Sequence, residues 1–304
     1  MSDERRVVSV DDLAAAIVRH EAEGYRLMTI SPADDPRRAD MDGVDRIRLE
    51  RAADAPPATG RAGMVYRDLV PGRVGGRIIA SHIAIAEGGP VPDYVHFHDV
   101  RFQMIFCHAG WVKVVYEDQG EAFVMEPGDC VLQPPGIRHR VLESSDGLEV
   151  VELGAPAEHD THRDHDLGLP TGRLLPDRRY GGQRFVRHVH DPDDWEPSLH
   201  DGWDVQHIAI SEATDGYADV RLLRSSGAAP DVTVHDRDFV FAFVRCGRLL
   251  HVGDSDTETL VAGDAVVVPA GVPTAFHTDT RTELLLVSIA SLHDDPSPHP
   301  AAAV

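Results

Sequence analysis

The amino-acid sequence predicts an all-β protein built from two tandem sandwiches or barrels, with a helical extension before them. Three segments recur in the same order. HDVRFQMIFCHAG (98–110) returns as HDRDFVFAFVRCG (235–247), GDCVLQPPGIRH (128–139) as GDAVVVPAGVPT (263–274), and HIAIAE (82–87) as HIAISE (207–212). Segments that repeat in register indicate duplication of one structural unit.

Within each copy, short apolar runs such as EAFVMEPGDCVLQPPG and LEVVELG are divided by Gly, Pro and Asp. Many short strands at regular spacing favour a sandwich or barrel over a βαβ sheet. The exception is SVDDLAAAIVRHEAEG at 9–24, where Ser9 is an expected N-cap and Gly24 a stop, followed by a strand at YRLMTI.

These patterns divide the chain into five parts. We expect a helix and surface segment packing on the barrels at 1–62, a first barrel at 63–155 and an inter-domain linker at 156–182. A second barrel follows at 183–293, and a flexible tail at 294–304.

Composition limits the function. The net charge of −22 argues against nucleic acid or an anionic membrane as a partner, and no run approaches the roughly 18 apolar residues of a membrane helix. The N-terminus lacks a signal pattern, so a cytoplasmic location is expected. Cys107, Cys130 and Cys246 form no CxxC pair, which argues against a disulfide framework or a thiolate zinc site.

Histidines carry the chemical signal in the first copy. His96 and His98 are two residues apart, so on a strand they point to the same face. Gln103 follows beyond a short turn, and His139 comes after PPG. Three imidazoles and an amide can thus converge inside one barrel, a donor set that suits a divalent first-row metal.

These motifs resemble those of the cupin family: a first motif of His-x-His, then Glu, then Gly, and a second of Gly, five residues, Pro-x-Gly, two residues, His. The first reads HFHDVRFQMIFCHAG here, and Gly128, Pro134, Gly136 and His139 match the second. The resemblance is strong over 75–155 and weaker over 200–292. It implies a bicupin of two double-stranded β-helix (jelly-roll) barrels, with a metal held by His96, His98 and His139.

Gln103 stands where the family usually has Glu. An amide cannot act as a general base and leaves the site one negative charge short, which favours anionic, bidentate ligands. Gln103 is our candidate catalytic residue. It is either a fourth metal ligand through its amide oxygen or a hydrogen-bond partner of a bound water or substrate.

The second copy keeps one of the four polar positions. His235 corresponds to His98, whereas Thr233, Val240 and Thr274 replace His96, Gln103 and His139. Its turn residues remain, so we expect a barrel without a metal site. His277 is off-register for a ligand.

Other residues are assigned from strand alternation. Tyr94 and Arg101 are predicted to contact substrate, and Ile105 and Leu132, with Cys107 and Cys130, to line an apolar pocket. The side chains expected outside the barrel are Arg138, Arg140 and His108. His82 and His207 are predicted to share a structural role, and His159, His162 and His165 to lie in a solvated linker.

Three functions remain open. The first is a mononuclear Fe(II) dioxygenase acting with O2 on a small chelating diketone, enol, phenol or oxo or hydroxy acid, as the resemblance to quercetinase-like and diketone-cleaving cupins implies. The others are a non-oxidative isomerase, lyase or decarboxylase, and a non-catalytic small-molecule-binding bicupin. Histidine ligands also suit Mn, Ni, Cu or Zn. The apolar face of Phe102, Met104 and Phe106 predicts either a homodimer or pairing of the two barrels.

Overall fold

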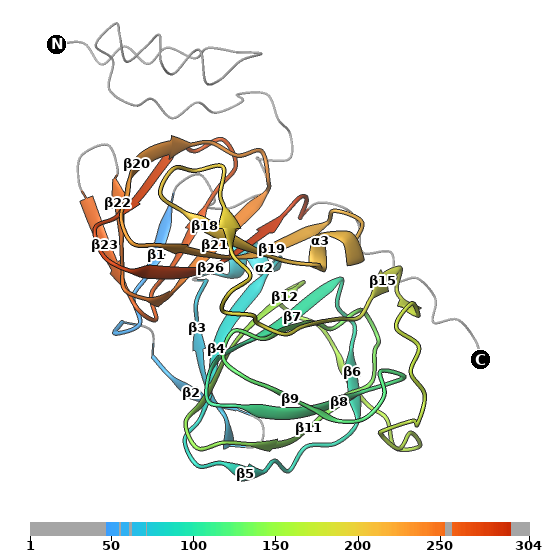
Figure 1. Cartoon of the computed structure of the whole chain (residues 1–304). Coiled ribbons are helices and arrows are strands. Elements are labelled where there is room, and N and C mark those ends of the chain that lie inside the picture. Colours follow the sequence, from blue (N-terminus) through green and yellow to red (C-terminus); the bar gives the residue numbers. More distant parts are fainter. Residues whose placement is uncertain (1–46, 55, 61–62, 71, 253–256, 293–304) are drawn as a thin grey trace, which may run out of the picture.

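The computed structural model describes residues 47–54, 56–60, 63–70, 72–252 and 257–292 (Figure 1). The helix predicted at 9–24, the strand after it and the tail at 294–304 lie outside these residues. Neither described helix, α2 (Arg73–Gly76) or α3 (Ile210–Ala213), is long and apolar enough to cross a bilayer. Almost all other regular structure in this part of the chain is β-strand, as predicted.

The first barrel is formed by two facing antiparallel sheets. One has the strand order β16-β10-β7-β12-β4-β3-β2, and the other β13-β6-β11-β8-β9, with β5 paired to β11. The bounds are β2 Ala58–Thr59, β3 Val65–Asp68, β4 Ile79–Ile85, β5 Gly89–Pro90, β6 His96–His98, β7 Phe102–Ala109, β8 Val112–Tyr116, β9 Phe123–Met125, β10 Cys130–Leu132, β11 His139–Ser144, β12 Leu148–Ala155, β13 Thr161–Arg163 and β16 Val186–His188.

The second barrel repeats this plan. Its larger sheet runs β1-β24-β21-β26-β19-β18-β17 and its smaller sheet β20-β25-β22-β23. The bounds are β1 Arg48–Glu50, β17 Glu196–Pro197, β18 Asp204–Ile208, β19 Ala218–Ser225, β20 Ala228–Thr233, β21 Phe239–Cys246, β22 Arg248–Val252, β23 Thr257–Val261, β24 Ala265–Val268, β25 Thr274–Thr278 and β26 Thr282–Ile289. A small hairpin, β14 (Arg179–Tyr180) and β15 (Gln183–Arg184), lies between the barrels in sequence.

The larger sheets of the two barrels pack against each other through one shared core, as the adjacent ribbons of Figure 1 show. Phe102, Met104 and Phe106 are fully buried in this core, together with Phe241 and Phe243 of the second barrel. Aromatic side chains bury a large apolar area each, so this contact contributes much of the stability. The apolar face of β7 is therefore used for barrel pairing, and the homodimer stays a prediction.

Each barrel also has an edge strand whose sequence lies next to the other barrel. β1 lies before the first barrel in sequence but pairs with β24 of the second. β16 lies within the range predicted for the second barrel but pairs with β10 of the first. In Figure 1, β1 is the blue strand among the orange strands of the C-terminal barrel. Both exchanges cover a sheet edge that would otherwise expose unpaired backbone groups.

Two of the three repeated segments occupy equivalent places. The 98–110 and 235–247 segments lead into and form β7 and β21, and the turn glycines Gly110 and Gly247 both have positive φ. At Gly247 a Cβ atom would lie 2.1 Å from the carbonyl oxygen of Arg281, so no other residue fits there.

The third repeat is a chance similarity of sequence, and the prediction that its two segments are structurally equivalent was wrong. HIAIAE lies on β4 and HIAISE on β18 and α3. β18 pairs with β19, in the way that β3 pairs with β4, so the strand equivalent to β4 is β19.

Candidate metal centre

Three histidines converge at one end of the first barrel. His96 and His98 lie on β6, and His139 begins β11, which pairs antiparallel with β6 so that His139 opposes His96. One ring nitrogen from each lies within 4.8 Å of the others. The ring centroids are 4.3 to 5.3 Å apart. This spacing fits three imidazoles around a single divalent metal ion.

The outer hydrogen bonds of these rings fix which nitrogen faces the centre. Nδ1 of His96 is 2.7 Å from the carbonyl oxygen of Tyr94, and Nδ1 of His139 is 3.0 Å from that of Ile137. A carbonyl only accepts, so Nδ1 carries the proton in both rings and Nε2 carries the lone pair. The Nδ1 atom of His98 is 2.9 Å from the hydroxyl of Thr161. The donor set therefore fits a metal on a chemical ground as well as a geometric one.

Gln103 lies beside the histidines and is 2% exposed. Its side-chain nitrogen donates to Oε1 of Glu152 at 2.5 Å. Because a carboxylate only accepts, the amide nitrogen must face Glu152, and the amide oxygen is the atom that Gln103 can offer to a metal or a ligand. Whether Gln103 ligates directly stays a prediction.

A cavity of about 360 Å³ opens next to the histidines. Its wall is mainly apolar and includes Ile105 and Tyr94, as predicted from the sequence. The polar residues in this wall include Gln103, Glu152 and Tyr116. Such a cavity suits a small organic molecule held by a few polar groups.

Tyr116 orders part of this wall. Burial raises the pKa of its phenol far above the ordinary value, so the hydroxyl stays protonated. It donates to Oε1 of Gln133 at 2.6 Å, and the backbone nitrogen of Gln133 donates to the carbonyl of Gln103 at 2.8 Å. These hydrogen bonds hold the strand that carries Gln103 on the side of β10.

Two predicted substrate contacts lie elsewhere. Leu132 is fully buried in the core between the barrels, because it pairs with Met104 across β10 and β7 and shares its outward face. Cys130 faces the same way, opposite Phe106. Arg101 stacks on the ring of Tyr217 from the second barrel, with its guanidinium carbon 4.1 Å from the ring centroid, and does not line the cavity.

The two arginines beside His139 both have outward side chains. Arg138 lies outside the cavity, as predicted, stacked over Phe97 at 4.4 Å and paired with Asp164. Arg140 borders the cavity. It pairs with Val115 across β11 and β8, between two pairs that line the cavity, His139 with Tyr116 and Val141 with Val114. Residues that oppose each other across two strands share a face, so the Arg140 side chain lies on the outer face, as predicted.

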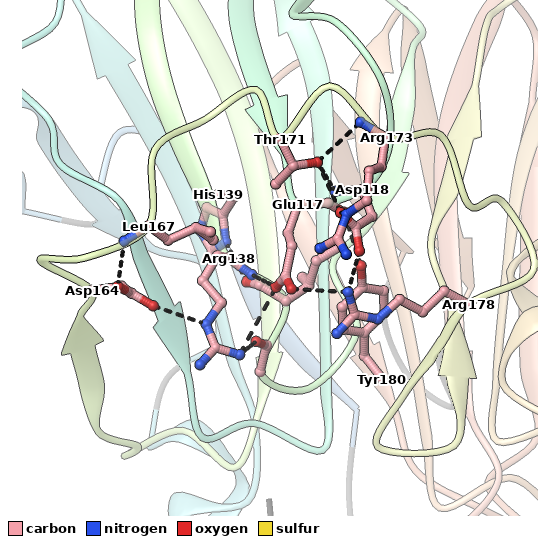
Figure 2. A network of polar contacts seen from close by, with 12 residues as sticks. Glu117, Asp118, Arg138, His139, Asp164, Leu167, Thr171, Arg173, Arg178 and Tyr180 are labelled. Carbon is pink, nitrogen blue, oxygen red and sulfur yellow. Dashed lines mark hydrogen bonds and ion pairs between the residues drawn. The ribbon is translucent and has the colours of Figure 1, made fainter. Parts of the chain in front are cut away.

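A buried polar network holds the segment 164–180 against this end of the barrel, as Figure 2 shows. Asp118 is fully buried and accepts from Thr171 at 2.8 Å and Arg173 at 2.7 Å, and it also pairs with Arg178. Burial raises the pKa of Asp118, but these hydrogen bonds and ion pairs outweigh it, so the pKa is lowered and the group stays ionised.

The same network reaches the metal centre. Arg138 lies between Glu117 and Asp164, and the Glu117 backbone nitrogen donates to the Arg138 carbonyl at 2.8 Å (Figure 2). His139 follows Arg138 directly, so this network of ion pairs and hydrogen bonds helps to position the histidine. The predicted linker is thus part of the site's support.

The sequence predicted a solvated linker for His159, His162 and His165, but two of these histidines contact other side chains. The His159 ring contacts that of His98 with centroids 5.3 Å apart. His162 pairs with Asp99 at 2.7 Å and stacks on Phe97. β13, which carries Thr161, pairs with β6, and this pairing brings the segment over the ligand strand.

The second barrel has lost the histidine pair but kept the backbone around it. Thr233 and Thr274 oppose each other across β20 and β25, in the way that His96 and His139 do. The Gly271 nitrogen donates to the His235 carbonyl at 2.8 Å, just as Gly136 donates to His98 at 3.2 Å. Within the described ranges, no group of three potential ligands occurs in this barrel.

His108 and His82 lie between the barrels. His108 packs edge-on against Phe243 with ring centroids 5.2 Å apart, outside the first barrel as predicted. His82 bonds to Glu149 at 2.9 Å, whereas His207 is exposed on β18 near Glu196. The shared role predicted for His82 and His207 was therefore wrong. Burial lowers the pKa of His82, and it lowers that of His108 to about 4.

Sequence reasoning missed Glu152 and Thr161. A signal for Glu152 was present: Leu148, Val150 and Glu152 alternate along β12 and all line the cavity, so one inward position has an acidic side chain. Thr161 was hidden because pairing of β13 with β6 depends on the fold of the linker.

Comparison with known proteins supports the same fold. Residues 81–153 match the family model described as a cupin domain. No curated protein matched the sequence. Among solved structures, a salicylate 1,2-dioxygenase from Pseudaminobacter salicylatoxidans superposes with a TM-score of 0.60 at 15% identity, covering 93% of this chain and 95% of that one.

Two further structures are oxalate decarboxylases. A variant from B. subtilis gives a TM-score of 0.59 at 13% identity, covering 95% of this chain and 86% of that one. A formate complex from Lactobacillus farciminis gives 0.54 at 15% identity, covering 79% and 85%. At these identities the likeness concerns the fold. The first barrel therefore matches the cupin domain, and the described part of the chain has the two-barrel, all-β fold of these structures.

Proposed function

We propose that the protein is a metal-dependent enzyme, a mononuclear non-heme Fe(II) dioxygenase acting on a small chelating organic substrate. The observation that carries the proposal is the set of three imidazoles with an amide, Gln103, in place of a carboxylate. Such a centre keeps the full charge of a divalent ion, which favours an anionic, bidentate substrate. The salicylate 1,2-dioxygenase fold is compatible with this chemistry.

The residues of this chain have separate roles in the proposed reaction. His96, His98 and His139 would hold the metal, which when bound supplies Lewis acidity and redox chemistry with O2. The apolar wall excludes water from the substrate. Glu152 lies where it can accept a proton from a substrate hydroxyl. Its hydrogen bond to the amide nitrogen of Gln103 leaves the amide oxygen available to a metal or a ligand.

Elemental analysis of protein purified without a histidine tag tests the first step. We expect about one equivalent of iron in the wild type. It should be lost in His139→Ala and retained in the matched control His207→Ala, whose side chain is exposed in the barrel without a metal site. Failure to bind any divalent metal under loading conditions would overturn the proposal. Oxygen uptake with a panel of chelating phenols, diketones and hydroxy acids then tests the reaction class.

A second function is favoured by one observation. Decarboxylases of this architecture usually have carboxylates near the metal, and Gln103 counts against them on sequence alone. Glu152 brings a carboxylate into the cavity from β12. The alternative is therefore a non-oxidative, metal-dependent decarboxylase, lyase or isomerase. Product formation without oxygen uptake, with Mn or another divalent ion bound, would decide for it.

A further inference from the structure

The cavity beside the three histidines runs along the interior of the first barrel. On β12, Glu152 lies at the histidine end and Leu148 four residues away, which is about 13 Å at the rise of a strand. On β8, in the facing sheet, Tyr116 lies opposite His139 and Val112 lies at the other end. Residues from both ends line the same cavity, so it extends from the metal centre toward the far end of the barrel.

The strand pairing shows which side chains face this space. Val150 pairs with Ile83, and Leu148 with Ile85, across β12 and β4. Val150 and Leu148 are two and four residues from Glu152, whose carboxylate reaches inward to the amide beside the histidines. Residues at even spacing on a strand share a face, so these four apolar side chains point into the barrel, where they are part of or pack against its inner core cluster.

Polar and apolar groups are separated along the cavity. The histidines, Gln103, Glu152 and Tyr116 lie at one end. Toward the other end the described lining side chains are apolar except for Tyr66, whose hydroxyl is 3.7 Å from the sulfur of Met64. A buried water usually needs about two to four polar partners, more than the side chains of this half offer. A hydrocarbon group, in contrast, leaves water and gains dispersion contacts there.

We propose, on the basis of the function proposed above, that the substrate is amphipathic, with a chelating pair of oxygen atoms at one end and an unbranched hydrocarbon tail at the other. The histidines fix the head at the polar end of the cavity. The tail lies along β12 and β4 toward Leu148 and Ile85. Ile83 and Val112, which border its path from the two facing sheets, determine the length of tail that is accepted.

A series of diketones with one fixed head tests the tail site. The probes are pentane-2,4-dione, heptane-2,4-dione, nonane-2,4-dione and undecane-2,4-dione, in which one side chain grows by two carbons at each step. Dissociation constants are measured by calorimetry in metal-free protein and in protein loaded with zinc, which has no redox chemistry. In the wild type, affinity should rise about four-fold for each added methylene until the cavity is filled. An affinity that does not rise with chain length overturns the proposal.

Three variants locate the tail. Ile83→Phe and Val112→Phe each place a ring in the apolar half, from opposite sheets. Each should weaken binding of undecane-2,4-dione about ten-fold or more and change that of pentane-2,4-dione by less than about two-fold. The matched control Val124→Phe adds the same ring at an exposed position of β9 and should give the wild-type series.

Circular dichroism and melting temperature establish that each variant is folded. If one cavity variant does not fold, the other variant and the wild-type series decide. A dependence on chain length that is unchanged by a folded cavity variant means that the tail binds elsewhere, and it overturns the proposal.

Metal analysis of the same samples separates the two hypotheses. Protein that binds no metal, but whose affinity still rises with chain length and falls in Ile83→Phe, contradicts the proposed function and supports the tail site. Protein that binds metal through its histidines but shows no dependence on chain length does the reverse.

Discussion

The contact between the barrels should be sensitive to acid because His108 is buried there as a neutral base. Burial lowers its pKa from an ordinary 6.5 to about 4. The groups that face it are Glu149, which raises the pKa, and Arg245, His82 and Arg67, which lower it. Its side chain is 17% exposed, so solvent screens these interactions only partly.

The sign of the effect follows from proton binding. Between pH 6.5 and pH 4 the unfolded chain carries a proton on this histidine and the folded chain does not. Stability therefore falls as the pH drops below 6.5, and the loss levels off below about pH 4. Lowering the pH from 7.5 to 5 should cost about 2 kcal/mol from His108 alone. His82, whose pKa is also lowered by burial, adds in the same direction.

Urea unfolding followed by tryptophan fluorescence at pH 7.5 and 5 measures this loss. Other groups titrate over the same range, so the test is a difference: His108→Gln should lose about 2 kcal/mol less than the wild type on acidification. His207→Gln, at an exposed site, is the matched control and should behave as the wild type does. Equal losses in the wild type and His108→Gln would refute the argument.

Three other substitutions follow from the site. Asp118→Ala removes the acceptor of three groups on the segment 164–180; because its two arginine partners are partly exposed, it should cost about 1–2 kcal/mol in urea unfolding and expose this segment to limited proteolysis. Gln103→Glu places two carboxylates in contact, so the melting temperature of the metal-free protein should fall and added divalent metal should restore it; an unchanged melting temperature would mean that Glu152 is not its neighbour. Tyr116→Phe leaves the buried oxygen of Gln133 without its donor and should cost about 1–3 kcal/mol in the same unfolding assay, whereas no loss would show that water replaces the hydroxyl.

The sequence predicted those features that depend on local pattern. Two histidines two apart on a strand must share a face, and the repeated glycine turns must bend the chain in the same way. This was enough for the all-β class, the two barrels and the convergence of His96, His98 and His139.

The features that sequence could not predict depend on contacts between distant segments. Alternation says that Ile105 and Leu132 are both buried, but only the pairing of Leu132 with Met104 shows that it faces the other barrel. The support of His98 by Thr161 requires a linker strand that pairs with β6.

The exchange of strands β1 and β16 affects any attempt to isolate one barrel by cutting the chain. A cut within 156–182 leaves the half with the three histidines without β16 and the other half without β1. Each fragment would also expose to water the aromatic faces that now meet, with Phe102 and Phe106 on one side and Phe241 and Phe243 on the other. Open edges beside apolar faces promote association of chains. A truncation that preserves the histidine-bearing barrel must therefore retain β16 and replace its exposed aromatic residues with polar ones.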